Sequence, residues 1–413
     1  MTGLTASVII TSRKRPEHLA LCITAAGQLL HPAFEIVVVA DSDSLVRLPP
    51  ELMPRIKTRV FDEANISEAR NHGIAMAAGD LLAFIDDDAV PEPAWLARLC
   101  APLADPQVAS AGGHVRGRNG ISMQWTGRMV DALARHQPLP NAPAIIGQHT
   151  GLALKTEGTC MAHRRDALLE AGGFDPGFRF YLDETDLNLR LAAAGAGAAL
   201  VPLAQVHHAF AASERRRADR VPQNLHEVGA SLALFLRRHA GRADPARLEE
   251  EVQERCTGLA AHVRAGRITR DEAARMIDTL RAGWDEGLTR RLALPPPITD
   301  APPPFLPWRH EGTGRHRILS GHPRNRARLM QEAEAAADAG DIVSLHLYSL
   351  TPRRHRIAFQ PGGFWLQEGG LYGASLRSDP AFRPWRRKAR VAREAALVAE
   401  LRQLDSDLPR IVE

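Results

Sequence analysis

The 413-residue chain has little cysteine and no long apolar run. Its cysteines, Cys22, Cys100, Cys160 and Cys256, lie far apart without a CxxC pair, so the sequence supports neither a zinc knuckle nor a disulfide framework. No apolar stretch approaches the roughly 18 to 20 residues of a membrane span, and the first residues lack the pattern of a secretory signal. A soluble, multidomain, cytoplasmic protein is therefore expected.

Glycine is absent from TSRKRPEHL, the segment that follows the first predicted strand. A glycine-rich turn there would cradle a triphosphate with its backbone amides, so its absence argues against a nucleotidyltransferase. Continuous apolar runs at 6–12, 35–40 and 81–86 predict strands that are buried on both faces of a parallel sheet. Between the last two, Asn65 and Glu68 form a capping-box pattern, and Gly79 predicts the end of that helix. We interpret these elements as a βαβ unit.

Three adjacent aspartates, Asp86, Asp87 and Asp88, follow the third predicted strand. Because strand side chains alternate in direction, Asp86 and Asp88 are expected to face one side and Asp87 the other. The carboxyl edge of an open parallel sheet is where α/β proteins bind ligands. Two carboxylates converging there suit a hard divalent cation that carries phosphate oxygens. The alternative is that Asp88 caps a helix opening near Pro91 while the other two are solvated.

Five motifs occur in an order and spacing that resemble the GT-A-fold glycosyltransferases of family 2. They are Asp41 after EIVVVA, then EARNHGIAMAAGD, LLAFIDDDAVPEP, RRDALLEAGGFDP and LDETDLNLRL. The resemblance covers about residues 7–213, half of the chain. It implies an α/β fold with the Rossmann-like mixed sheet of the nucleotide-diphospho-sugar transferases.

The remaining sequence predicts a helical segment and a small C-terminal α/β module after the catalytic domain. PPPITDAPPPFLPW is typical of a stiff linker. The irregular segment 112–158 and the module are expected to govern acceptor choice. The predicted divisions are a GT-A catalytic domain at 1–213 (donor half 1–111, acceptor half 112–213), a helical extension at 214–294, a Pro-rich linker at 295–308, and an α/β module with a basic C-terminal helix at 309–413.

The resemblance also implies residues that bind the donor. In the family's DxD motif the first carboxylate approaches the ribose and the last holds Mg²⁺ or Mn²⁺ on the diphosphate, which gives these roles to Asp86 and Asp88. Asp41 would read the nucleobase edge, and Arg70 would lie against the nucleotide. The family often has two aspartates where this chain has Ala40 and Asp41, so a capped turn is the alternative for Asp41. The implied donor-binding residues are Thr11, Arg13, Asp41, Arg70, Asp86, Asp87 and Asp88.

An acceptor hydroxyl needs a base within hydrogen-bond reach, and the resemblance implies Glu184 for this role. The family pattern is Glu-Asp-x-Asp-Leu with the second acid as base, whereas this chain reads Asp-Glu-Thr-Asp-Leu from Asp183. The two acids are exchanged, so Asp183 stays open as the base. The family commonly has a histidine near the end of a later strand as a third metal ligand, and His208 aligns there better than His207.

The function implied by the resemblance is a metal-dependent, inverting glycosyltransferase. The donor would be a nucleoside-diphosphate sugar, with UDP favoured, and the acceptor a glycan, lipid-linked or protein hydroxyl; nucleic acid is not expected as a partner. Three alternatives stay open. A nucleotidyltransferase would share the nucleotide-binding fold and the metal carboxylates, and a retaining glycosyltransferase would share the donor site. A non-catalytic scaffold could dock on a membrane through the basic C-terminal helix. Peripheral contact with the inner membrane face and a homo-oligomer are left open as well.

Overall fold

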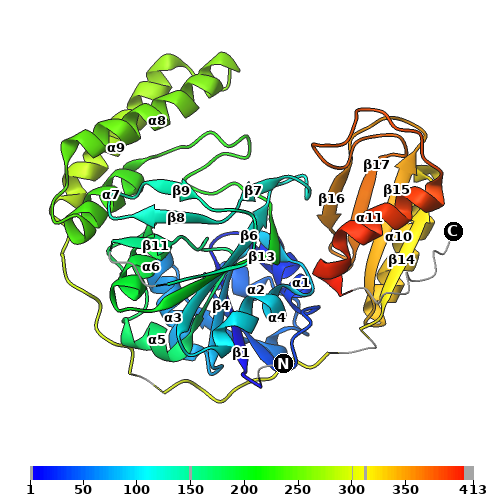
Figure 1. The fold of residues 1–413 in the computed structure, drawn as a ribbon, viewed down its shortest axis with the longest axis horizontal. Helices are drawn as coiled ribbons and strands as arrows, with labels where there is room; N and C mark the ends of the chain where they lie inside the picture. Colours follow the sequence, from blue (N-terminus) through cyan, green and yellow to red (C-terminus); the bar gives the residue numbers. More distant parts are fainter. Residues whose placement is uncertain (1–2, 148–150, 300, 311–313, 404–413) are drawn as a thin grey trace.

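The computed structural model of the protein describes residues 3–147, 151–299, 301–310 and 314–403 (Figure 1). Parts of the predicted segment 112–158 and of the predicted module 309–413 therefore lie outside the described residues. The described chain forms a large mixed sheet with helices on both faces, a protruding group of helices, and a separate four-stranded sheet with its own helices. The α/β fold class predicted from the sequence is confirmed.

The large sheet has the strand order β10-β13-β6-β12-β4-β1-β2-β3, with β5 paired to β13 and β7 paired to β6. The four parallel strands β4-β1-β2-β3 include the three predicted strands, of which the second begins one residue earlier than expected. The strands of this sheet are β1 (Ala6–Ser12), β2 (Phe34–Ala40), β3 (Lys57–Val60), β4 (Leu81–Asp86), β5 (Ala89–Pro91), β6 (Val108–Arg116), β7 (Met123–Trp125), β10 (Ala144–Ile146), β12 (Met161–Arg164) and β13 (Gly197–His208). A second, three-stranded sheet contains β8 (Arg128–Asp131), β9 (His136–Pro138) and β11 (Leu152–Leu154).

Helices cover both faces of the large sheet because its parallel strands are apolar on both sides. Val8 and Ile10 of β1 pack into one core with α1, α2 and α4, whereas Ile9 packs into another with α3, α5 and α6. The parallel register pairs Thr11 with Asp86, which brings the carboxyl ends of β1 and β4 together. The helices of this domain are α1 (Pro16–Ala26), α2 (Ser42–Val46), α3 (Ile66–Met76), α4 (Trp95–Cys100), α5 (Arg165–Glu170) and α6 (Asp183–Ala193).

The predicted start of α3 is confirmed, but its predicted end is wrong. The Asn65 side chain accepts a hydrogen bond from the Glu68 amide at 3.2 Å, as an N-cap does. The helix ends at Met76, before Gly79. The chain turns away there because Glu35 accepts the Ala78 amide at 2.7 Å. Gly79 instead allows a close approach to β1, where a Cβ atom would lie 2.7 Å from the backbone nitrogen of Ser7.

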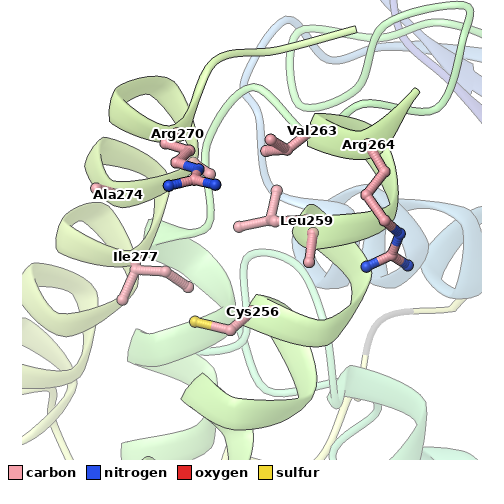
Figure 2. A pocket seen from close by; sticks show the side chains of 9 residues that line it. Cys256, Leu259, Val263, Arg264, Arg270, Ala274 and Ile277 are labelled. Atoms are coloured by element: carbon pink, nitrogen blue, oxygen red, sulfur yellow. The ribbon is translucent and has the colours of Figure 1, made fainter. Parts of the chain in front are cut away.

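Three helices, α7 (His226–His239), α8 (Pro245–Arg264) and α9 (Arg270–Gly287), follow the large sheet, and α8 and α9 project away from it (Figure 1). A groove of about 380 Å³ lies between α8 and α9, lined by apolar side chains such as Leu259, Val263 and Ile277 and by Arg264 and Arg270 (Figure 2). None of the predicted site residues lines this groove.

Glycines bring α7 and α9 into close contact, and we expect Gly283→Ala to destabilise the protein. A methyl group at Gly283 would overlap the His226 carbonyl of α7. Overpacking should outweigh the better helix propensity of alanine and lower the free energy of unfolding by about 1–3 kcal/mol. Gly258 on α8 faces open space, so Gly258→Ala is a matched control that should raise stability by up to about 1 kcal/mol. Urea unfolding of both variants measures the difference, and equal stabilities would contradict the packing argument.

Residues 288–299 and 301–310 lie along the outside of the large-sheet domain, between α9 and the C-terminal module (Figure 1). This Pro-rich segment is held in place, since Leu306 donates its amide to Glu35 at 2.8 Å and Trp308 packs against Phe34 with ring centroids 6.4 Å apart. The module has the sheet order β14-β15-β17-β16. It contains β14 (His316–Gly321), α10 (Arg326–Asp338), β15 (Ile342–Ser349), β16 (Arg356–Phe359), β17 (Trp365–Gly370) and α11 (Arg387–Arg402). The sequence predicted the first strand, helix and strand, and missed β16 and β17.

The predicted basic C-terminal helix is α11, and several of its arginines are engaged inside the protein. Arg390 pairs with Glu394 at 3.2 Å, Arg393 with Asp379 at 2.6 Å, and Arg402 with Glu92 at 2.8 Å. Membrane docking through this helix stays a prediction. Among the described residues, no helix combines the length and the apolar character needed to cross a bilayer.

Candidate active site

The carboxyl end of β4 brings two carboxylates and an imidazole together. One ligand atom each of Asp86, Asp88 and His208 lies within 4.8 Å of the others. Asp88 is almost fully buried, and its Oδ1 lies 3.2 Å from His208 Nε2 while its Oδ2 accepts the Ala211 amide at 2.7 Å. Burial alone would raise the pKa of Asp88, but His208 and Arg15 hold it below its ordinary value. Asp88 is therefore an ionised carboxylate, and it does not cap a helix, because the N-cap of α4 is Ala94.

Asp87 points away from this group, as the strand alternation predicts. Its buried carboxylate accepts hydrogen bonds from Ser12 Oγ at 2.6 Å and from Arg15 Nε at 3.0 Å. Both partners belong to the end of β1 and the turn that follows it. Asp87 therefore ties β1 to β4 at the edge of the sheet where the other two aspartates meet.

The two histidines at the end of β13 have different partners. His208 lies beside Asp88, and its Nδ1 is 3.4 Å from Gln124 Oε1. His207 points the other way, with Nε2 2.8 Å from Glu92 Oε1 and its ring 4.7 Å from that of Trp365 in the C-terminal module. The structure thus brings His208, rather than His207, to the acidic group.

Arg70 of α3 links the group of Asp86, Asp88 and His208 to the acidic start of α6. Its guanidinium contacts Asp183 through NH1, while NH2 lies 3.4 Å from Asp86 Oδ1 and donates to the Gly158 carbonyl at 3.3 Å. Burial raises the pKa of Asp183 to about 7, although the charge of Arg70 opposes this shift. Arg70 is itself buried, and its fixed guanidinium holds Asp183 in a defined position.

Glu184 lies in the first turn of α6, as predicted, and pairs with Lys155 at 2.7 Å. Lys155 also lies 3.2 Å from Glu157, which in turn pairs with Arg128 at 2.5 Å. Burial would raise the pKa of Glu184, but Lys155 lowers it to about 2. Glu184 is therefore ionised over the whole physiological pH range.

The backbone immediately before this acidic pair is strained. Tyr181 and Leu182 both have left-handed conformations, with φ values of 72° and 63°. Each such non-glycine residue costs about 1–2 kcal/mol. The surrounding contacts hold this conformation, which sets the direction in which the side chains of Asp183 and Glu184 point.

The remaining predicted donor residues line the ends of β1 and β2. Thr11 is buried beside Asp86 in the strand register. Arg13 pairs with Glu214 at 2.5 Å, and Asp41 caps α2 by accepting the Ser44 amide at 3.0 Å. Asp41 also accepts the Lys14 amide at 2.6 Å, so it holds the two loops together. The capped turn considered from the sequence is present, while a contact of Asp41 with a nucleobase stays a prediction.

Sequence reasoning missed several residues that pair with predicted ones, among them Arg15, Lys155 and Glu214. Arg15 pairs with Asp87 at 2.5 Å, and Glu214 holds Arg13 from the loop after β13. Lys155 and Glu184 are separated by 29 positions in the chain. No local pattern indicates such pairs, although the scarcity of lysine in this arginine-rich sequence could have drawn attention to Lys155.

We expect Lys155→Met to lower the free energy of unfolding by about 3–5 kcal/mol, because the change leaves the buried carboxylate of Glu184 without its ion-pair partner. Glu184 has a depressed pKa, so its ion pair adds stability above pH 4.5, the ordinary value, and this contribution disappears as pH falls toward 2. The stability difference between variant and wild type should therefore shrink at acidic pH. Denaturant unfolding at several pH values measures it, with Lys388→Met as an exposed control expected to stay within about 0.5 kcal/mol. A constant difference down to acidic pH would contradict the ion-pair explanation.

The fold and this acidic site define the class of protein. A family model described as "Glycosyltransferase like family 2" matches residues 5–230, more than half of the chain. The chain belongs to this glycosyltransferase family, and its large-sheet domain has the family's GT-A fold.

Curated proteins are similar to parts of this chain. The O-antigen biosynthesis protein RfbC of Myxococcus xanthus is 27% identical over 52% of this chain and 18% of that protein. The pre-mycofactocin glycosyltransferase of Mycobacterium tuberculosis is 30% identical over 34% of this chain and 29% of that protein. The chain thus spans less than a third of the length of these two relatives. A crystal structure of GalNAc-T7 with UDP, GalNAc and Mn²⁺ matches 50% of this chain and 44% of that chain, with 18% identity and a TM-score of 0.37.

Proposed function

We propose that the protein is a metal-dependent, inverting glycosyltransferase that moves a sugar from a nucleoside diphosphate, UDP being favoured, to a glycan hydroxyl. The observation that carries this proposal is the meeting of Asp86, Asp88 and His208 at the edge of the sheet. Family membership supports the reaction class, and the name of the RfbC relative supports a polysaccharide acceptor. The division into a catalytic domain at 1–213, a helical extension and a C-terminal module belongs to the same proposal.

The donor set fits a divalent cation. Two carboxylates and one imidazole suit Mn²⁺ or Mg²⁺, with the imidazole favouring Mn²⁺. Hydrogen bonding of His208 Nδ1 to Gln124 would leave the Nε2 lone pair toward Asp88 and the ion. When bound there with a donor, the cation would neutralise the charge that develops on the departing β-phosphate.

The side chains of the chain itself perform the remaining steps of the proposed reaction. Asp88 is held ionised and fixed in direction by the Ala211 amide, and Arg70 holds Asp183 next to the donor site. Glu184 would take the proton of the acceptor hydroxyl while the hydroxyl oxygen attacks the anomeric carbon from the face opposite the diphosphate. Attack from that face inverts the configuration of the sugar.

A panel of nucleotide sugars tests this proposal. Each donor is screened for thermal stabilisation and slow hydrolysis, with Mn²⁺, with Mg²⁺ and with a chelator. At least one donor, a UDP-sugar, should stabilise the protein only when the cation is present. If no donor binds in a metal-dependent way, the proposal is wrong. The anomeric configuration of the product then separates an inverting from a retaining reaction.

A further inference from the structure

The short ladder of β5 and β13 joins the proposed metal ligands, Asp86, Asp88 and His208, to the C-terminal module. In this antiparallel ladder His208 pairs with Ala89 and His207 with Val90. Asp88 directly precedes β5, and Glu92 directly follows it and donates its amide to the Gln205 carbonyl at 3.0 Å. One end of the ladder thus carries two proposed metal ligands, while the other end carries Glu92.

The module inserts an arginine at that other end. Arg402, the last residue of α11, contacts both carboxylate oxygens of Glu92, with Nε at 2.8 Å and NH2 at 3.2 Å. His207 Nε2 reaches the same carboxylate at 2.8 Å. The side chains of Arg402 and Glu92 are 3% and 1% exposed, so this ion pair is closed to solvent. Trp365 of β17 stacks on the guanidinium at 4.4 Å.

Backbone contacts make this junction a fixed part of the fold. The Ala94 amide donates to the Leu401 carbonyl at 2.9 Å, directly beside the ion pair. On another side, the Ile357 amide of β16 donates to the Asn119 carbonyl at 2.9 Å, in the acceptor half of the catalytic domain. A buried ion pair is favourable only in a well-defined geometry with its hydrogen bonds satisfied, so the junction permits little variation in the position of the ladder.

We propose that Arg402 is a positioning residue for the metal site, which it influences through Glu92, His207 and the β5–β13 ladder. This inference rests on the proposed function. Side chains of adjacent strand residues point to opposite faces, so Arg402 shares the Glu92 carboxylate with His207 and lies on the face away from His208. It holds the register in which Asp88 and His208 face each other at 3.2 Å. The C-terminal module is thereby part of the catalytic unit.

The test measures Mn²⁺ affinity of the full-length protein, from the EPR signal of free Mn²⁺ during a titration with the metal alone. Arg402→Lys keeps the charge but loses the two-point contact, and Glu92→Gln combined with Arg402→Met removes the ion pair without leaving an unpaired charge. Both variants should bind Mn²⁺ about 10- to 100-fold more weakly, as changes around metal ligands do. Raised Mn²⁺ should restore kcat.

The matched control is Arg98→Ala. Arg98 of α4 donates to the Glu400 carbonyl at 3.0 Å, so its loss weakens the docking of α11 without touching Glu92 or His207. Its Mn²⁺ affinity should stay within about twofold of the wild type, and thermal unfolding must show every variant folded at the titration temperature. Unchanged affinity in both ion-pair variants, or an equal loss in Arg98→Ala, overturns the inference. A wild-type protein that binds no Mn²⁺ overturns the proposed metal site itself and this inference with it.

Discussion

Asp88→Asn is expected to abolish metal-dependent donor binding and to lower the transfer rate by about 10³-fold. The substitution keeps the side chain's shape and an acceptor for the Ala211 amide, but removes the charge that lies 3.2 Å from His208. A cation that stabilises developing phosphate charge is worth several kcal/mol, and each 1.36 kcal/mol is a factor of ten in rate. Calorimetric titration of a UDP-sugar with and without Mn²⁺ measures the binding, and product formation measures the rate.

Two controls separate loss of the proposed metal site from loss of the fold. Asp278 is an exposed aspartate of α9, and Asp278→Asn should leave both binding and transfer unchanged. Addition of a chelator to the wild-type protein should reproduce the Asp88→Asn result and should have no further effect on the variant. Metal-dependent donor binding that survives in Asp88→Asn would show that Asp88 is not a ligand.

The fold around the site was predictable where the pattern is local. Continuous apolar runs predicted both ends of β1 and of β4 correctly, because a parallel strand that is buried on both faces is apolar along its whole length. The separation of Asp87 from Asp86 and Asp88 was also predicted, although β4 ends at Asp86 and the other two aspartates lie in the turn before β5. The exchange of the two acids at Asp183 and Glu184 could be seen in the sequence. Its effect on the two carboxylates could not be predicted, because that effect depends on their contacts with Arg70 and Lys155.

Contacts between distant residues could not be predicted in this way. Glu92 and Arg402 are 310 positions apart, and neither has a neighbour in sequence that indicates the pair. The same holds for the two strands of the module that were missed, since Ile357 and Phe359 of β16 and Trp365 of β17 pack against distant residues such as Val90 and Ile121. Periodicity reports burial, but not the partner that provides it.

Glu184→Gln is the second change with a large expected effect, since removal of a general base costs about 10²- to 10⁴-fold in kcat. Glutamine keeps the length of the side chain, and Glu184 is not among the proposed metal ligands, so donor and Mn²⁺ binding should be retained. Glu170→Gln, on the exposed side of α5, is the matched control and should leave kcat unchanged. Retained transfer in Glu184→Gln would move the base to another residue.

The pH dependence of kcat decides between the two neighbouring acids. A base acts only when it is deprotonated, and Lys155 lowers the pKa of Glu184 to about 2 against the opposing effect of burial. With Glu184 as base, kcat at saturating Mn²⁺ and donor should be flat from pH 8 down to about 5. Burial raises the pKa of Asp183 to about 7, so with that residue as base kcat would fall about tenfold for each pH unit below 7. A fall in kcat below pH 7 that is absent in Asp183→Asn would assign the base to Asp183. The first acid of the motif, rather than the second, would then be the base in this chain.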